Sequence, residues 1–166
     1  MFTANPNLMH PNEMLIRKFY QAFGQKDYQA MQQSYHPDAF FSDPVFPNLS
    51  AAEVKAMWKM LVTSGRDLVI IPGGIQADDN VGQCRWEARY TFSGTGRKVR
   101  NVIHAQFKFK NGLILRHEDK FDFWKWSRMA LGASGLLLGW SPYLLNAVRQ
   151  KARRRLERFM KAEDSL

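Results

Sequence analysis

Apolar residues recur at helical spacing near the start of the chain. Five apolar residues between Leu15 and Phe23 fall on one face of the segment that begins at Asn12. This spacing predicts an amphipathic helix. Asn12 is the expected N-cap, and Gly24 is the expected left-handed residue at the C-terminal end.

A second, shorter helix is expected to begin at Asp27, which can cap it, and to run through Tyr35. The turn His36-Pro37-Asp38 would end that helix, because the residue before a proline disfavours helical geometry. Residues 39–43 then have the pattern of a strand, and Pro44 stops it.

A third helix is predicted from its N-terminal signature. Ser50 and Glu53 form a capping box, in which each side chain satisfies a free backbone amide at the start of the helix. The helix is expected to run to Ser64 and to end at Gly65.

After Gly65 the hydrophobic period changes to two, which predicts strands. Residues 68–71 form the first of these, and Pro72-Gly73-Gly74 indicates a bulge or a sharp bend before a turn at residues 78–80. Three longer alternating strands follow. Their apolar faces carry Trp86, Ala88, Tyr90 and Phe92; then Val99, Asn101, Ile103, Ala105, Phe107 and Phe109; then Leu113, Leu115, His117, Asp119, Phe121 and Phe123.

The hairpin between the last two strands determines which residues face one another. A two-residue turn at Asn111-Gly112 would pair a polar face with an apolar one. A three-residue loop over residues 110–112, with Gly112 left-handed, keeps the apolar faces together and places Ala105 opposite His117.

Three helices followed by a meander, without alternation of strands and helices, predict an α+β fold. We expect the N-terminal helices to pack on a strongly curved antiparallel sheet in a cone-shaped arrangement. A helical extension would follow at the C-terminus.

Three polar residues interrupt the apolar strand faces: Asn101, His117 and Asp119. Asp43 joins them if its strand keeps Phe41 on the inner face. A carboxylate in an apolar cavity tends toward a raised pKa, which suits proton transfer near neutral pH. We therefore predict Asp43, His117 and Asp119 as catalytic residues. The predicted substrate-binding residues are Asn101, Tyr20, Phe41, Trp58, Trp86, Tyr90 and Phe107.

Plainer interpretations of these residues remain open. Asp43 can simply begin the turn at Pro44, and His117 with Asp119 can form a buried structural pair. Asn101 can be a satisfied core amide. The four histidines do not converge in the predicted fold, which disfavours a metal site, and no motif indicates a cofactor.

The chain of 166 residues has the length of one domain with a sizeable core. Its single cysteine, Cys84, excludes an intrachain disulfide framework and a cysteine-based zinc site. This cysteine usage suits a reducing compartment, so we expect a cytoplasmic protein, and no secretory signal is visible at the N-terminus.

The net charge of +9 is concentrated in the tail. We therefore divide the chain into a domain over residues 1–124 and a basic helical extension over 125–166, packed on the domain or on a dimer partner. Residues 129–148 carry no charge, but several glycines and a proline argue against a membrane span. Ser141 and Pro142 predict the start of a last helix.

An apolar stripe follows this last helix from Leu145 to Phe159, and lysines and arginines occupy much of the remaining surface. The stripe can pack on the domain or on a second subunit, or it can contact an anionic membrane surface through residues 141–166. Nucleic acid is not expected as a partner, because the tail lacks an aromatic platform and any groove-reading motif.

The order of these segments resembles the ketosteroid isomerase, SnoaL-like polyketide cyclase and nuclear transport factor superfamily of cystatin-like α+β folds. The resemblance covers residues 12–123. It rests on the first helix with Gln25-Lys26-Asp27, on Tyr35-His36-Pro37-Asp38-Ala39, Ser42-Asp43-Pro44-Val45 and Gly96-Arg97-Lys98, and on Phe107-Lys108-Phe109 and His117-Glu118-Asp119.

The resemblance implies a cofactor-free enzyme of isomerase, cyclase or hydrolase type that acts on a small apolar carbonyl or hydroxyl compound. Asp43 matches the general base of the isomerases, but the two oxyanion donors of that family correspond to Phe19 and Ala105 here, so a steroid isomerase is not expected. The cyclases, with an inward Asp and His late in the sheet, are the better analogy for His117 and Asp119. Relatives are often dimers through the outer sheet face, which implies a homodimer. One alternative is a non-catalytic module for a lipid-like ligand, and another is a protein-interaction domain with a filled core and no cavity.

Overall fold

The computed structural model describes residues 9–165 and confirms the α+β fold. The six helices of this part of the chain are α1 (Pro11–Gly24), α2 (Tyr28–Gln33), α3 (Ala51–Ser64), α4 (Phe123–Leu131), α5 (Ala133–Leu138) and α6 (Pro142–Glu163). Its six strands are β1 (Tyr35–Ser42), β2 (Leu49–Ser50), β3 (Val69–Ala77), β4 (Val81–Phe92), β5 (Arg97–Lys110) and β6 (Leu113–Lys120).

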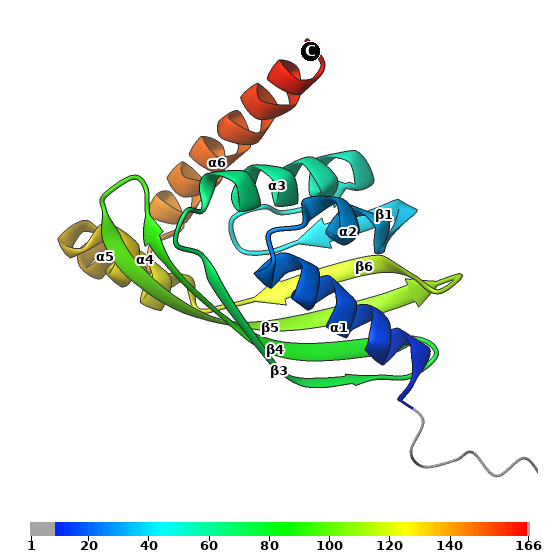
Figure 1. Cartoon of the computed structure of the whole chain (residues 1–166). Coiled ribbons are helices and arrows are strands. Elements are labelled where there is room, and N and C mark those ends of the chain that lie inside the picture. The colour runs from blue at the N-terminus through cyan, green and yellow to red at the C-terminus, as the bar shows by residue number, and fades with distance from the viewer. Residues whose placement is uncertain (1–8, 166) are drawn as a thin grey trace, which may run out of the picture.

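The strands form one sheet in the order β2-β1-β6-β5-β4-β3. Figure 1 shows this sheet curving around α1, α2 and α3, with α4 and α5 at the far end of the long β4–β5 hairpin. The expected antiparallel sheet is correct for every pair except one, because β1 runs parallel to β6. That parallel pair requires a long crossover, and the helix α3 with strands β3 to β5 provides it.

The ends of the first two helices differ from the prediction. The N-cap of α1 is His10, whose Nδ1 accepts the backbone N–H of Asn12. Asn12 instead donates from its side chain to the backbone oxygen of Asp78, which ties α1 to the β3–β4 turn. The left-handed residue after α1 is Lys26, at φ 60°, and not Gly24.

Three other local predictions are confirmed. Asp27 caps α2 by accepting the N–H of Ala30, although α2 ends at Gln33 and Tyr35 already belongs to β1. The capping box of Ser50 starts α3, and the register of β3 against β4 shifts between Gly73 and Gln76, which is the expected bulge.

The predicted β5–β6 hairpin register is wrong. The turn has two residues, Asn111 and Gly112, both with positive φ, and Lys110 pairs with Leu113. A register shift then opens in β6, where Ile114 and Arg116 pair with consecutive residues of β5. The extra residue, Leu115, restores the inward direction of the following odd-numbered residues, and His117 lies opposite Phe107.

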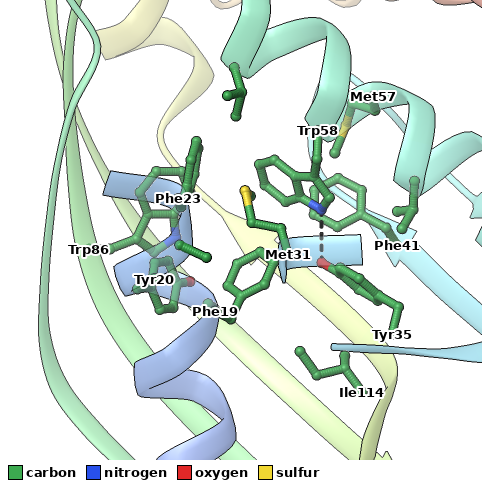
Figure 2. Close-up of a cluster of buried hydrophobic side chains, with 14 of the residues drawn as sticks. Phe19, Tyr20, Phe23, Met31, Tyr35, Phe41, Met57, Trp58, Trp86 and Ile114 are labelled. Atoms are coloured by element: carbon green, nitrogen blue, oxygen red, sulfur yellow. Dashed lines mark hydrogen bonds between the residues drawn. The ribbon is translucent and has the colours of Figure 1, made fainter. Parts of the chain in front are cut away.

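The main core fills the space between the helices and the concave face of the sheet. Figure 2 shows its aromatic side chains approaching from α1, from α3 and from the strands. Leu156 of α6 is part of this core, and Arg153 and Glu163 of α6 form ion pairs with α3. The apolar stripe of α6 therefore packs against the domain.

A second, smaller core forms where α4 covers the outer end of the β4–β5 hairpin. Val99 of β5 and Trp126 of α4 are buried together there. Trp126 also donates from its indole N–H to the hydroxyl of Tyr90, at 2.8 Å. The extension thus closes over one end of the concave face. Between residues 9 and 165, no helix combines the length and the apolar character that crossing a bilayer requires.

Candidate functional site

His117 lies at the centre of the interior and is completely buried. Its ring is surrounded by aromatic rings from four elements: the ring centre of Phe107 is 4.4 Å away, that of Phe41 5.1 Å and that of Phe19 5.7 Å. Trp58 stacks on another side at 6.0 Å. Because these rings exclude other molecules from the imidazole, His117 can act only through its two hydrogen-bond partners.

Those partners form a continuous chain of hydrogen bonds. Trp58 donates its indole N–H to the hydroxyl oxygen of Tyr35, at 2.9 Å, as Figure 2 shows. The Tyr35 hydroxyl lies 2.6 Å from Nδ1 of His117, and Nε2 of His117 lies 3.1 Å from Oδ1 of Asp119. Burial raises the pKa of Tyr35, so its hydroxyl stays protonated and can donate to Nδ1. With Nδ1 as acceptor, Nε2 carries the proton and donates to Asp119.

Asp119 ends this chain and is 4% exposed. Its Oδ1 also receives the indole N–H of Trp86, at 3.4 Å. Its other oxygen has no hydrogen-bond partner among residues 9–165. Within that range, the hydroxyl of Tyr20 is the only fully buried side-chain polar atom that lacks a hydrogen-bond partner. Since Oδ2 of Asp119 also lacks a partner, it cannot be fully buried and must be accessible to solvent. One carboxylate oxygen is therefore held in place while the other is free.

Asp43 lies beside Asp119 because of the parallel pairing of β1 and β6. Ser42 of β1 pairs with Glu118 of β6. Asp43 and Asp119 directly follow these two residues in the sequence. Asp43 also begins the turn at Pro44: its Oδ1 accepts the backbone N–H groups of Val45 and Phe46, at 2.7 and 2.5 Å. The turn interpretation is correct, and it leaves Oδ2 of the half-buried carboxyl free of these bonds.

The pKa of Asp43 is raised from 3.8 to about 7. Burial is the main cause, and the neighbouring charge of Asp119 adds to it. The N–H groups of Phe46 and Val45 and the guanidinium of Arg149 act in the opposite direction. Arg149 of α6 reaches this corner because it donates to the backbone oxygen of Pro44, at 2.8 Å.

The predicted binding residues separate into two groups. Phe41, Trp58 and Phe107 pack directly on His117. The others lie farther along the interior: the ring centre of Tyr20 of α1 is 5.7 Å from that of Trp86, and Asn101 and Tyr90 follow on β5 and β4. Burial raises the pKa of Tyr20, so its unpartnered hydroxyl is a neutral donor.

Sequence reasoning missed three contributors to this region. Tyr35 was expected at the end of a helix, whereas it begins β1 and bonds to His117. Its alternation with Phe41 along the strand was the available signal. Trp126 and Arg149 lie in the extension, and nothing in the local pattern connects them with Tyr90 or Asp43.

Two hollows on the surface of the described residues include neither His117 nor Asp119. One lies on the outer sheet face around Gln83, Gln106 and Lys108, and the other follows α6 around Arg154 and Arg158. A ligand cavity beside Asp119 therefore stays a prediction. Over the described residues, no three His, Cys, Asp or Glu side chains are grouped so as to hold a metal ion. The expected independence from cofactors also stays a prediction.

Comparison with solved structures shows the same fold in other proteins. An NTF2-like protein of unknown function from Burkholderia pseudomallei is 21% identical, with a TM-score of 0.65 over 73% of this chain and 98% of its own. An M. tuberculosis LEH-like epoxide hydrolase is 15% identical, with a TM-score of 0.60 over 77% and 96%. TerC co-crystallised with polyporic acid is 19% identical, with a TM-score of 0.58 over 68% and 92%.

No curated protein matches the sequence. A family model does: the SnoaL-like domain matches residues 16–117, which is more than half of the chain. This stretch includes α1 from Ile16 onward, the three long strands up to His117 and all the aromatic residues around it. The helices α4, α5 and α6 lie outside it. By this match the chain belongs to the SnoaL-like domain family.

Proposed function

We propose that the protein binds a small, mostly apolar molecule on the concave face of the sheet and carries out acid–base chemistry on its carbonyl or hydroxyl group. Asp43 is the proton acceptor and donor in this proposal. Asp119 orients the substrate, and Asn101 donates a hydrogen bond to it. No cofactor takes part.

The observation that carries the proposal is the carboxyl of Asp43, with a pKa of about 7 beside Asp119. A group whose pKa matches the surrounding pH is present in both forms and can take up and return a proton in one cycle. Two carboxyls in one apolar site that differ in environment can divide the work between them. Asp119, whose Oδ1 accepts hydrogen bonds from His117 and Trp86, is suited to a fixed role.

His117 is a positioning residue in this scheme, because it touches Asp119 and no ligand. Its Nε2–H, together with the indole N–H of Trp86, fixes the plane of the Asp119 carboxylate. The remaining oxygen, Oδ2, is then directed into accessible space, where a substrate hydroxyl could donate to it. Tyr35 and Trp58 hold the imidazole from behind.

The structural relatives support a small-molecule role. One is an LEH-like epoxide hydrolase and another was co-crystallised with polyporic acid. Both share the fold of this chain at under 20% identity, so they support the class of ligand and not a particular reaction.

The alternative is a binding module without catalysis. It is favoured by the cover that α4 places over Tyr90, since a closed end suits the retention of a lipid-like ligand. The two functions share the binding face and differ only in whether a proton is transferred.

Hydrogen–deuterium exchange of cyclic ketones tests the proposal. Cyclohexanone and 2-decalone are incubated with the protein in heavy water, and loss of the α-proton signals is followed by NMR. We expect the exchange rate to rise with pH up to about 7 and then to level, because the base form of Asp43 becomes fully populated there. Asp43→Asn should abolish the acceleration.

The matched control is Asp38→Asn, which removes an exposed carboxyl of β1 and should leave the rate unchanged. Tryptophan fluorescence measures ketone binding separately. If the protein binds the ketone but exchanges it no faster than Asp43→Asn does, the result supports the binding module instead. Neither binding nor exchange would overturn both functions.

The homodimer and the cytoplasmic location also remain proposals. A dimer would use the outer sheet face, where Glu87 is paired with Arg89 and Arg100. Light scattering on the full chain distinguishes a dimer from a monomer.

A further inference from the structure

The corner between α5 and α6 exposes an unusual amount of apolar surface. Leu136, Leu137 and Leu138 are consecutive, and all three face solvent, with Leu137 68% exposed. Trp140 and Tyr143 follow at 71% and 78%. We call residues 136–143 the apolar corner. Single exposed apolar residues are ordinary in proteins, but a contiguous group of large ones marks an interaction surface.

Two glycines explain why the leucines point outward. A Cβ at Gly135 would lie 1.9 Å from the backbone oxygen of Ser127, and one at Gly139 would lie 2.1 Å from the Ser127 hydroxyl. The glycine face of α5 therefore lies directly on the backbone of α4. The leucines between the two glycines occupy the remaining faces of this short helix, where none of the residues 9–165 covers them.

Two tryptophans at the edge of the apolar corner, Trp124 and Trp140, each combine an apolar ring with a polar indole N–H. Trp140 donates its indole N–H to the backbone oxygen of Leu137, and half-exposed Trp124 donates to that of Leu136. Tryptophan and tyrosine with one apolar side and one polar atom favour the boundary between a membrane's acyl chains and its headgroups.

The charges around the corner select the partner. From Phe123 to Leu156 there is no Asp or Glu, whereas Lys and Arg occur seven times. Lys125 and Arg128 flank the corner on α4, and the exposed Lys151 lies about 12 Å beyond Tyr143 along α6. A second copy docking by this face would oppose like charges, since a symmetric contact pairs each patch with itself. An anionic bilayer complements both the apolar and the basic residues.

We propose that the apolar corner inserts into the interfacial layer of an anionic membrane and holds the protein there reversibly. The contact differs from the one expected from the sequence, which used the stripe of α6. That stripe is packed on the domain through Leu156, so residues 136–143 form the apolar contact and the basic residues of α6 add attraction.

Vesicle flotation with the full chain tests the proposal. The probe is phosphatidylcholine vesicles with about 30% phosphatidylserine, compared with pure phosphatidylcholine. We expect the protein to float with the anionic vesicles and to bind the neutral ones at least about tenfold more weakly. Leu137→Glu should lower the partition coefficient by about tenfold or more, because the carboxylate must enter the apolar layer.

Phe40→Glu is the matched control, since Phe40 of β1 is 59% exposed and gains the same charge away from the corner. It should retain the wild-type partition to within about twofold. Equal binding by the two variants, or no binding of the wild type to anionic vesicles, would overturn the proposal. So would a wild-type dimer that Leu137→Glu dissociates in the absence of lipid, because the corner would then be a protein contact. Circular dichroism of both variants confirms that the helices persist.

Discussion

Replacing Asp43 with asparagine should stabilise the protein, and the gain should depend on pH. The native carboxyl holds its proton up to a pH of about 7, whereas the same group in the unfolded chain releases it near 3.8. Between these two values the unfolded state binds fewer protons than the native state, so the stability of the wild type falls as the pH rises. Asparagine carries no such charge. Its side-chain oxygen can still accept the N–H groups of Val45 and Phe46.

The size of the effect follows from the width of this window. Each pH unit is worth at most about 1.4 kcal/mol for one group, and the window from 3.8 to about 7 gives an upper limit of about 4 kcal/mol. Asp43 is half-buried, and partial access of solvent to a carboxyl reduces the penalty. We expect Asp43→Asn to be more stable than the wild type by roughly 2–4 kcal/mol at pH 8 and nearly equal to it at pH 3.5.

Urea unfolding followed by tryptophan fluorescence measures this difference at several pH values. Groups other than residue 43 titrate in both proteins, so they cancel when one stability curve is subtracted from the other. The difference should grow between pH 4 and 7 and stay constant above that. A difference that is flat across this range would show that Asp43 ionises normally in the native protein, and the proposed base would then lose its basis.

Three further predictions concern the packing of the domain, and urea unfolding at neutral pH tests each of them. Tyr35→Phe should cost roughly 1–3 kcal/mol, because Nδ1 of His117 loses its buried donor; an unchanged midpoint would mean that this bond is not formed in solution. Leu156→Ala should lower the free energy of unfolding by about 2–5 kcal/mol, whereas Leu137→Ala on the exposed corner should change it by less than about 0.5 kcal/mol. Similar losses for the two variants would contradict the placement of α6. Gly82→Ala should cost about 1–3 kcal/mol, since the new Cβ would lie 2.8 Å from a side chain of α1; a neutral result would show that α1 packs less closely on β4.

The sequence predicted the fold well where one local rule decides the structure. The capping box at Ser50 and the cap at Asp27 depend on residues three apart, and both formed as expected. The alternation in β4 and β5 correctly placed Trp86 and Asn101 on the buried face. His117 and Asp119 are both buried as well, although the register used to place them was wrong.

Predictions failed where two local rules gave different answers or where the partner lies far along the chain. Asn111-Gly112 favours a two-residue turn, whereas keeping the apolar strand faces together favours a three-residue loop. The bulge at Leu115 allows the two-residue turn and still keeps the apolar faces together. No sequence pattern indicates this bulge. The pairing of β1 with β6 could not be obtained from residues 39–43 alone. The contact between Arg149 and Pro44 joins segments from opposite ends of the chain. Such contacts depend on how α6 packs across α3.

The bulge at Leu115 affects which lengths of the β5–β6 hairpin loop the fold can accept. It separates the direction of the β6 side chains from the geometry of the hairpin loop. A change of loop length by one residue can be absorbed by losing or moving the bulge, while the histidine and the aspartate keep facing inward. A hairpin loop of different length is therefore compatible with the same buried positions of His117 and Asp119.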